Sequence, residues 1–561
     1  MTGAAVSQDE VRALLGEEAD DVDILFADAR YGFAHAVTQA TVRPSGQASR
    51  SFSDRVDRVV LNRALGIPIF LAVMYLMFMF MFTINIGGAF IDFFDIAAGA
   101  IFVEGTAELL QMINTPEWLI IGLAYGLGGG VQVVATFISI IAFLYLFMSV
   151  LEDSGYMARA AFVMDRFMRA IGLPGKSFVP LLVGFGCNVP AVMAARTLEN
   201  PRDRLLTVLM TPFMSCGARL PVYALFAAAF FTAGGQNLVF ALYLIGLLAA
   251  VLTGFILKRT LLEGQAMPFV MELPPYHLPT LKGVLIRTWD RTKGFVVRAG
   301  AVIVLMVLVL NVLNTTSTDG RFGHEDSEQS VLAAIGRTLA PAFSPMGLDA
   351  DNWPATVGIF TGILAKEAVV GTLDATYSSL AAADADAGEQ SGAEEDAPYS
   401  LSAGLNEAAA TIPVNLIDAL GRWADPLGLG GVAETATPEA ATEELEVGSG
   451  TFSAMAARFD GAAGAFAYLL FILLYSPCVA AIGAIQREIS TGWAAFAVLW
   501  TTGLGYVTAT VFYQAAIFSR DPVSASIWIG MMLGLLLMVV VGMRLWARRE
   551  PAPIELVTEG I

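Results

Sequence analysis

The chain contains three cysteines, and each lies in an apolar stretch that glycine or proline interrupts. Cys187 lies in G-F-G-C-N-V-P, Cys216 in F-M-S-C-G-A-R-L-P and Cys478 in Y-S-P-C-V. A thiolate is a soft ligand that suits borderline transition metals. A broken membrane helix frees backbone carbonyls, and such backbone is tolerated only where it is buried or lines a cavity. We therefore predict that these three thiols are metal ligands along a transport path.

Polar and thioether neighbours accompany these thiols. Asn188 follows the first cysteine, and Met214 and Ser215 precede the second. A buried cysteine is more often a small packing residue than a ligand, and proline kinks are common in ordinary membrane helix packing. The shared setting of all three favours the metal path. Arg219 lies in the same apolar segment as the second cysteine, and because a charge in lipid is costly it must face a cavity or a partner. We assign Asn188, Met214, Ser215 and Arg219 to the transport path or gate.

Two charged pairs lie at the ends or in the middle of apolar segments. Lys366 and Glu367 lie inside L-A-K-E-A-V-V-G-T-L, and Glu152 and Asp153 close the apolar run Val131–Leu151. Adjacent residues on a helix do not face each other, so each side chain pairs with another group or lines a gate. We assign all four to the gate. Ordinary interfacial charge at a helix end is the alternative interpretation.

These residues are held by apolar segments. The composition is 56% hydrophobic and 15% charged, and the mean hydropathy is +0.65, which excludes a soluble globular protein. We predict an all-α polytopic membrane protein with roughly 8–10 membrane-embedded helical segments, because about 20 apolar residues span the hydrocarbon core. The clearest runs are Ile67–Thr83, Val131–Leu151, Leu205–Phe231, Leu238–Leu257, Phe295–Leu313, Thr491–Tyr513 and Ile527–Met543, and the shorter or interrupted ones are Phe178–Ala195, Trp353–Val370 and Phe466–Ile485.

Basic residues indicate the orientation. Arginines precede the first run, and residues 259–298 and the C-terminal tail are also basic. The positive-inside rule then predicts a multi-pass protein of the cell membrane with both termini in the cytoplasm. The first ten residues have neither the basic start nor the apolar core of a signal peptide. We expect no disulfides and no nucleic-acid partner.

One apolar segment, Phe178–Ala195, follows G-L-P-G-K-S and has basic residues at both ends. A phosphate loop needs a glycine six residues before its lysine, and that position is Ala170, so we predict no nucleotide site. Basic charge on both flanks favours a re-entrant hairpin that returns to the same side. A broken spanning helix is the alternative.

A weak internal repeat organises the chain. In each half an apolar span and a charged cluster precede a cysteine-bearing break and a further span, and transporters often place their site where such repeats meet. Acidic, Ala- and Gly-rich residues in the second half predict a largely disordered insert. The predicted divisions are a cytoplasmic segment (1–62), a first gate repeat (63–258), a basic cytoplasmic loop (259–298), the start of a second gate repeat (299–380), the acidic low-complexity insert (381–460) and the rest of the second repeat with a C-terminal span (461–561).

Long motifs in this sequence resemble the membrane domain of the ferrous iron transport protein B family. They cover most of the chain from Ala27 to about Tyr513, apart from the acidic insert. They are E-D-S-G-Y-M-A-R-A-A-F-V-M-D-R, G-K-S-F-V-P-L-L-V-G-F-G-C-N-V-P-A-V-M-A-A-R-T-L-E, P-F-M-S-C-G-A-R-L-P-V-Y-A-L-F, M-E-L-P-P-Y-H-L-P-T-L, L-A-K-E-A-V-V-G-T-L and Y-S-P-C-V-A-A-I.

The resemblance implies Fe²⁺ import through two gate regions similar to those of nucleoside transporters. Family members usually begin with a cytoplasmic GTPase domain, whereas only about sixty residues precede the first span here. We therefore expect a transporter that is not itself an enzyme, with GTP used only by a separate GTPase chain. A small cytosolic accessory protein and a homo-oligomer are left open. The alternatives are a secondary transporter of another divalent metal or a nucleoside-like solute, and a non-transporting membrane regulator.

Overall fold

A computed structural model describes most of the chain as helices. The described residues are 22–41, 50–62, 65–78, 90–231, 234–262, 273–319, 329–366, 368–384, 400–421 and 447–549. Within these ranges there is no β-strand, and an isolated bridge joins Ser317 and Ser330. The prediction of an all-α fold is confirmed.

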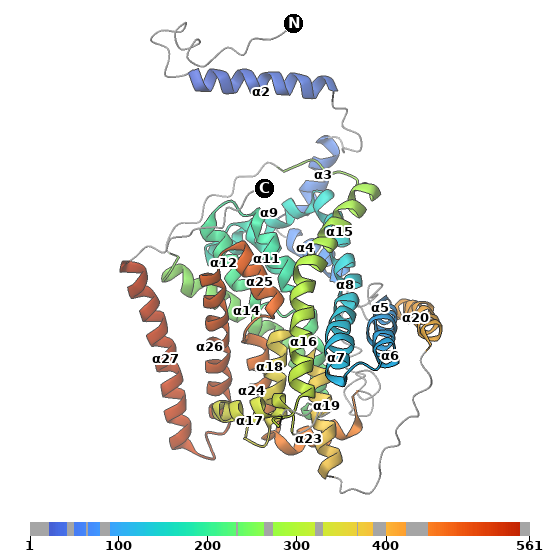
Figure 1. Cartoon of the computed structure of the whole chain (residues 1–561). Coiled ribbons are helices and arrows are strands. Elements are labelled where there is room, and N and C mark those ends of the chain that lie inside the picture. Colours follow the sequence, from blue (N-terminus) through green and yellow to red (C-terminus); the bar gives the residue numbers. More distant parts are fainter. Residues whose placement is uncertain are drawn as a thin grey trace.

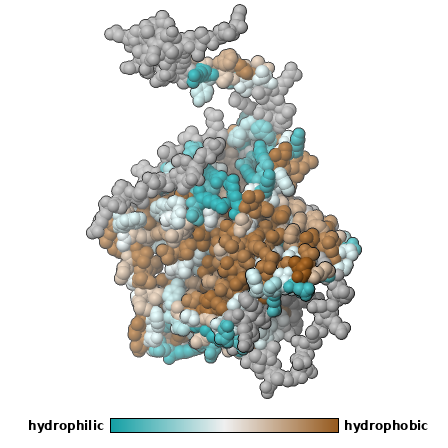
Figure 2. Space-filling view, in the orientation of Figure 1, coloured by the Kyte–Doolittle hydropathy of each residue, from teal (hydrophilic) through white to brown (hydrophobic). Residues whose placement is uncertain are grey.

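Among the residues that the structure describes, seven helical stretches are long and apolar enough to cross a membrane. They are Glu117–Asp153, Pro201–Phe230, Gly235–Arg259, Leu281–Thr315, Gly461–Glu488, Thr491–Ala516 and Pro522–Ala547, and two shorter apolar helices are Gly66–Leu76 and Trp353–Leu364. Figure 2 shows hydrophobic side chains across the middle of the body and hydrophilic ones toward its two ends. The chain is a multi-pass membrane protein, as predicted.

The first part of the chain leads from peripheral helices into the first long span (Figure 1). Its elements are α2 (Val22–Thr41), α3 (Arg50–Val60), α4 (Gly66–Phe78), α5 (Ile91–Ala98), the π-helical η4 (Gly99–Glu104), α6 (Gly105–Met112), α7 (Glu117–Ile120), the π-helical η5 (Ile121–Gly128) and α8 (Gly129–Asp153). Residues 91–128 were not predicted as helices, since their apolar periodicity is interrupted by glycines and acidic residues.

The first repeat begins after α8 and runs through a hairpin and a broken helix. Its elements are α9 (Tyr156–Ile171), the 3₁₀ turn η6 (Gly175–Ser177), the hairpin α10 (Phe178–Val183) and α11 (Asn188–Ala194), the 3₁₀ turn η7 (Ala195–Thr197), the broken span α12 (Pro201–Met210), η8 (Thr211–Phe213), η9 (Gly217–Arg219) and α13 (Leu220–Phe230), and the span α14 (Gly235–Arg259). α10 and α11 pack against each other, as expected for the hairpin, and its return to the same side of the membrane stays a prediction.

The second repeat has the same order. Its elements are α17 (Val331–Phe343), η11 (Ser344–Met346), the hairpin α18 (Trp353–Leu364) and α19 (Ala368–Asp384), the broken span α24 (Gly461–Leu474) and α25 (Val479–Glu488), and the span α26 (Thr491–Ala516). Figure 1 places α9 and α11 toward one end of the body and α17 and α19 toward the other. The two hairpins therefore enter from opposite ends, which is the arrangement of an inverted repeat.

Two predicted segments differ from the structure. The second half of the basic loop 259–298 is helical, because α15 (Leu281–Phe295) and the π-helical η10 (Val296–Gly300) run directly into α16 (Ala301–Thr315). Within the insert, α20 (Leu401–Gly421) is a helix that packs on α5. The prediction of disorder is wrong for α20, because its apolar residues can pack against the helix α5. Residues 385–399 and 422–446 lie outside the described residues. The remaining helices are α23 (Ser449–Arg458) and α27 (Pro522–Arg549).

Glycines allow η5 and α8 to lie directly against neighbouring backbone. A Cβ on Gly128 would overlap the carbonyl oxygen of Phe102 on η4, and a Cβ on Gly130 would lie 2.8 Å from Cα of Val304 on α16. Small residues at such crossings are how membrane helices approach closely without a hydrophobic driving force. This packing fixes α8, which carries one wall of the site described below.

We expect Gly128→Ala to destabilise the protein, because the methyl group meets backbone that cannot rotate away. Overpacking of this kind costs about 1–3 kcal/mol, and the melting temperature in detergent should fall accordingly. The adjacent Gly129→Ala is the matched control, since nothing lies within 4 Å of its added Cβ, and its melting temperature should stay equal or rise. Equal melting temperatures for the two variants would contradict this packing.

Candidate functional site

The helix breaks give all three cysteines the same local position. Cys187 immediately precedes α11, Cys216 precedes the η9 turn that leads into α13, and Cys478 precedes α25. Each has extended backbone, with ψ of 133°, 160° and 155° respectively, because the chain leaves one helical segment before starting the next. All three side chains are half-buried. The predicted coincidence of thiols with helix breaks is present in the structure.

The structure brings the cysteines of the two repeats toward one region. Cys187 and Cys478 pack against the same cluster, which includes Ile141 and Tyr145 of α8 and Phe295 of α15. The contact between α11 and α25 joins the two repeats at this point. The amide of Gly217, which follows Cys216, donates to the carbonyl of Gly186, which precedes Cys187, at 3.4 Å, so the third thiol borders the same region. We refer to these three thiols and their helix breaks as the thiol path.

Polar groups at the first break are buried and satisfied. Asn188 is buried, and its amide, oriented to suit its neighbours, donates to the carbonyls of Thr211 and Gly184 at 3.2 Å each. The Ser215 hydroxyl lies 2.9 Å from the Tyr223 hydroxyl. Met214 is buried against the turn of the α10–α11 hairpin. These three predicted path residues therefore connect the hairpin turn to the break between α12 and α13.

Arg219 is fully buried at the second thiol. Both terminal nitrogens donate to the Pro212 carbonyl at 3.4 Å, and Nε has no hydrogen-bond partner. No ion pair among the described residues includes it. Because a buried guanidinium is costly in lipid, we predicted that it faces a cavity or a partner, and among the described residues its partner is the Pro212 carbonyl.

Lys366 links the tip of the second hairpin to the second break. Its Nζ donates to the Ser476 carbonyl at 2.9 Å and lies 3.4 Å from the centre of the Tyr475 ring. The side chain is buried. Glu367, its predicted companion at the gate, lies outside the described residues.

Glu152 and Asp153 end α8 and pair with the basic helix α15. Glu152 accepts from Arg291 at 2.8 Å, and Asp153 accepts from Arg287. The structure thus places both acids in ion pairs at a helix end. It does not bring Asp153 to the thiol path, whereas Glu152 lines the cavity described next.

A cavity of about 590 Å³ lies between α8, α9, the first hairpin and α15. Its inner end, which we name the floor, consists of the lining residues that pack beside Cys187: Leu144, Tyr145, Met148 and Val183. Its charged lining residues, which we name the rim, are Glu152, Lys176, Arg196 and Arg291. Thioethers of Met148, Met157 and Met193 also line it.

Each cation of the rim pairs with a carboxylate. Arg291 pairs with Glu152, Lys176 pairs with Glu199 at 3.2 Å, and Arg196 pairs with Glu488 at 2.6 Å. Glu488 also pairs with Arg204 at 2.8 Å, so these three carboxylates meet four basic side chains. The ion pairs therefore reduce the positive charge at this opening without cancelling it.

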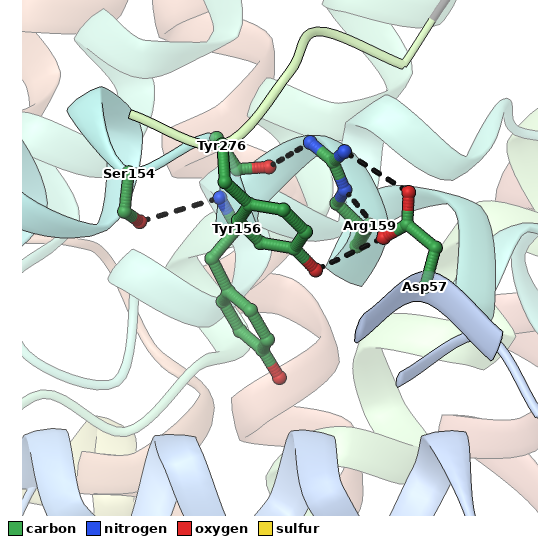
Figure 3. A network of polar contacts seen from close by, with 6 residues as sticks. Asp57, Ser154, Tyr156, Arg159 and Tyr276 are labelled. Carbon is green, nitrogen blue, oxygen red and sulfur yellow. Dashed lines mark hydrogen bonds and ion pairs between the residues drawn. The ribbon is translucent and has the colours of Figure 1, made fainter. Parts of the chain in front are cut away.

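A second polar network fixes the outer wall of the cavity (Figure 3). Arg159, fully buried on α9, donates to both Asp57 carboxylate oxygens at 3.0 and 3.1 Å and to the Gly155 carbonyl at 2.9 Å. It also stacks on the ring of Tyr276, whose hydroxyl donates to Asp57 at 3.0 Å. Burial raises the pKa of Tyr276 to about 12, so this donor persists at neutral pH. The network ties α3 and the segment before α15 to Gly155, a cavity residue.

Sequence reasoning missed four of these residues. Arg159 and Glu488 are charged groups beside apolar runs, which is the signal that identified Lys366. Asp57 carried no signal, because its partner is distant in sequence. Tyr145 lies inside an apolar run, and nothing in the sequence distinguishes it from a packing residue.

The described residues contain no group of three or more His, Cys, Asp and Glu side chains that could hold a metal ion. A closed cage would retain its ion, whereas transport needs sites weak enough to release it.

Sequence comparisons match this chain to two protein families and to known transporters. The family described as "Nucleoside recognition" (Gate) matches residues 134–230 and 296–492, and "Ferrous iron transport protein B C terminus" matches residues 239–291. The chain is 47% identical to the Fe(2+) transporter FeoB of Legionella pneumophila (strain Lens) over 94% of this chain and 68% of that protein. It is also 47% identical to the Fe(2+) transporter FeoB of Escherichia coli (strain K12), over 92% of this chain and 64% of that protein. No solved structure matches the chain.

The Glu488 cluster joins the repeats, and we expect its loss to destabilise the protein. Glu488, at the end of α25, is buried and pairs with Arg196 and with Arg204 at 2.8 Å. Glu488→Gln removes the shared charge, and breaking a buried pair costs about 3 kcal/mol. Glu199→Gln is the control, because the exposed Lys176–Glu199 pair contributes less than about 1 kcal/mol. Similar unfolding free energies in detergent would contradict the assignment.

Proposed function

Because the chain belongs to the ferrous iron transport protein B family, we propose that it is a permease that carries Fe²⁺ across the cell membrane. The supporting observation is the pair of helix breaks whose thiols, Cys187 and Cys478, pack in one cluster beside the cavity floor. Relatives that bear the printed name Fe(2+) transporter share 47% identity with the chain. Both termini lie in the cytoplasm in this proposal, since the basic α15 and the rim lie at one end of the bundle.

The proposed transport passes the ion between soft ligands in a water-poor centre. An ion in the cavity exchanges water for Cys187, then meets Cys478 across the contact between α11 and α25 and Cys216 near Tyr475. Thiolates suit Fe²⁺ better than Mg²⁺ or Ca²⁺, which prefer oxygen ligands. Inverted repeats place such a site where their broken helices meet.

A nucleoside-like solute is the second candidate. The Gate family carries the description "Nucleoside recognition", and a cavity of about 590 Å³ is within the range that holds small organic ligands. The thiols and thioethers of the path favour the metal, because a nucleoside has no use for soft ligands.

We further propose that a GTPase on a separate chain drives or gates transport by docking on the basic cytoplasmic face. The basic residues of α15, Lys282 and Lys293 among them, support docking of such a chain on this face. A small cytosolic accessory protein and assembly into a homo-oligomer fit the same scheme.

Single Cys→Ser substitutions should reduce Fe²⁺ uptake into proteoliposomes. Cys187→Ser, Cys216→Ser and Cys478→Ser each replace a soft ligand by a hard one, and a loss of about 1.4 kcal/mol per site corresponds to tenfold. Met538→Leu is the control, because this exposed residue of α27 lies away from the path. Uptake that all three serine variants preserve would reject the thiol path, and uptake of a nucleoside but not Fe²⁺ would favour the second candidate.

In proteoliposomes that contain only the purified chain, GTP should not change the rate of Fe²⁺ uptake, and the chain should not hydrolyse GTP. The measurement is phosphate release and Fe²⁺ uptake in the same proteoliposomes, with and without GTP. GTP hydrolysis by the purified chain would overturn the proposal of a separate GTPase.

A further inference from the structure

Arginines from three elements line a groove where the two repeats meet. The groove lies between α11, α25 and the continuous helix formed by α15, η10 and α16, and we name it the arginine groove. Arg196 of η7, Arg298 of η10 and Arg487 of α25 line it, and all three are exposed. Within the described part of the chain its lining holds one carboxylate, Glu488, which is buried and already pairs with Arg196 and Arg204.

Two of these arginines keep an uncompensated charge. Neither Arg298 nor Arg487 makes a side-chain hydrogen bond or an ion pair with any residue that the structure describes. Four basic side chains therefore surround the single carboxylate of Glu488. An excess of positive charge beside an apolar surface attracts an anion.

Both unpaired arginines lie at the charged ends of long uncharged helical runs. Residues 299–315, which follow Arg298, and residues 461–486, which precede Arg487, contain no Asp, Glu, Lys or Arg. Both runs belong to helices long enough to cross a membrane. Arginines at such ends extend toward the headgroup level of the bilayer. In the view of Figure 1, α25 and α16 lie side by side, and Figure 2 shows hydrophilic side chains above a hydrophobic band on this face.

Glycines keep the groove open between its two walls. Gly294 on α15 and Gly483 on α25 line it, and a Cβ on either would meet no atom within 4 Å. The lining beside them is apolar and includes Phe295, Ala299 and Val302. The volume of about 50 Å³ is far below the roughly 300–1,000 Å³ of pockets that enclose organic solutes. The groove therefore suits part of a lipid that lies along the protein surface.

We propose that the arginine groove binds an anionic phospholipid, whose headgroup phosphate lies between Arg298 and Arg487 and whose acyl chain lies along the apolar lining. Guanidinium groups bind phosphate through paired, charge-assisted hydrogen bonds, and basic pockets between membrane helices are typical sites for anionic headgroups. The bound lipid connects α25 of the second repeat to the helix formed by α15 and α16. The inference does not depend on which solute the protein carries.

The test measures the melting temperature of the purified full chain in detergent with added dioleoylphosphatidylglycerol. This anionic lipid should raise the melting temperature as its concentration rises, because it binds the folded state. Dioleoylphosphatidylcholine, which has the same acyl chains, and inorganic phosphate should each raise it much less. Equal stabilisation by phosphatidylcholine overturns the recognition of charge. Equal stabilisation by inorganic phosphate shows a site for a free anion and overturns the lipid site.

Arg298→Gln and Arg487→Gln should each weaken the apparent affinity for phosphatidylglycerol about fivefold, the contribution of one basic residue beside anionic headgroups. Arg166→Gln is the matched control, because Arg166 is exposed on α9 and lines neither the groove nor the larger cavity. This variant should keep the affinity of the unsubstituted protein. An equal loss in Arg166→Gln reduces the effect to general surface charge and overturns the site.

Gly483→Leu tests the groove without changing any charge. Its side chain should fill the groove and weaken the affinity for phosphatidylglycerol at least as much as the loss of one arginine. The melting temperature without lipid should stay equal or rise, because leucine favours a helix over glycine. Gly534→Leu on α27 is the control, since a Cβ there also meets no atom within 4 Å. An unchanged affinity in Gly483→Leu overturns the site, and this variant decides the question even where an arginine variant does not fold.

Discussion

Backbone groups freed inside a membrane must find partners within the protein, and this constraint shapes both repeats. At the first break the Asn188 amide donates to the Thr211 and Gly184 carbonyls, and the Gly217 amide donates to the Gly186 carbonyl at 3.4 Å. At the second, Lys366 donates to the Ser476 carbonyl. In each case a hairpin tip meets the break of the helix that follows it. A hairpin and its break therefore form one unit, and the thiol path exists because these units keep non-helical backbone stable.

The centre of the bundle carries two buried cations beside its thiols. Arg219 lies at the first break, and Lys366 lies over the Tyr475 ring at the second. A passing divalent cation would meet strong repulsion from both in a low dielectric. In the proposed transport, metal binding by Cys216 and Cys478 displaces the thiol protons and so supplies the opposite charge at the same place. The proposal therefore uses these two thiols both as ligands and as counter-charges.

Residue type and spacing predicted the cysteines, their breaks and Lys366, because glycine, proline and charge within apolar runs are rare and local signals. The hairpin could be favoured but not decided from flanking charge, since the contact between α10 and α11 that it requires is visible only in the structure. The π-helical η5 and the insert helix α20 depend on tertiary neighbours. The sequence did not single out Tyr145 for the same reason, because the cavity that it lines is formed by four separate elements.

The two hairpins differ in how tightly their tips are covered. The first borders the cavity, so its floor is accessible from the end that holds α9 and α15 (Figure 1). The second lies so close to α24 that a Cβ on Gly362 would overlap the Tyr475 hydroxyl, and one on Gly358 would lie 2.9 Å from the Tyr468 hydroxyl. In the proposed transport, an ion that passes Cys478 therefore meets a closed contact between α18 and α24. Passage requires this contact to part, and in an inverted repeat the symmetric motion would close the first hairpin over its cavity.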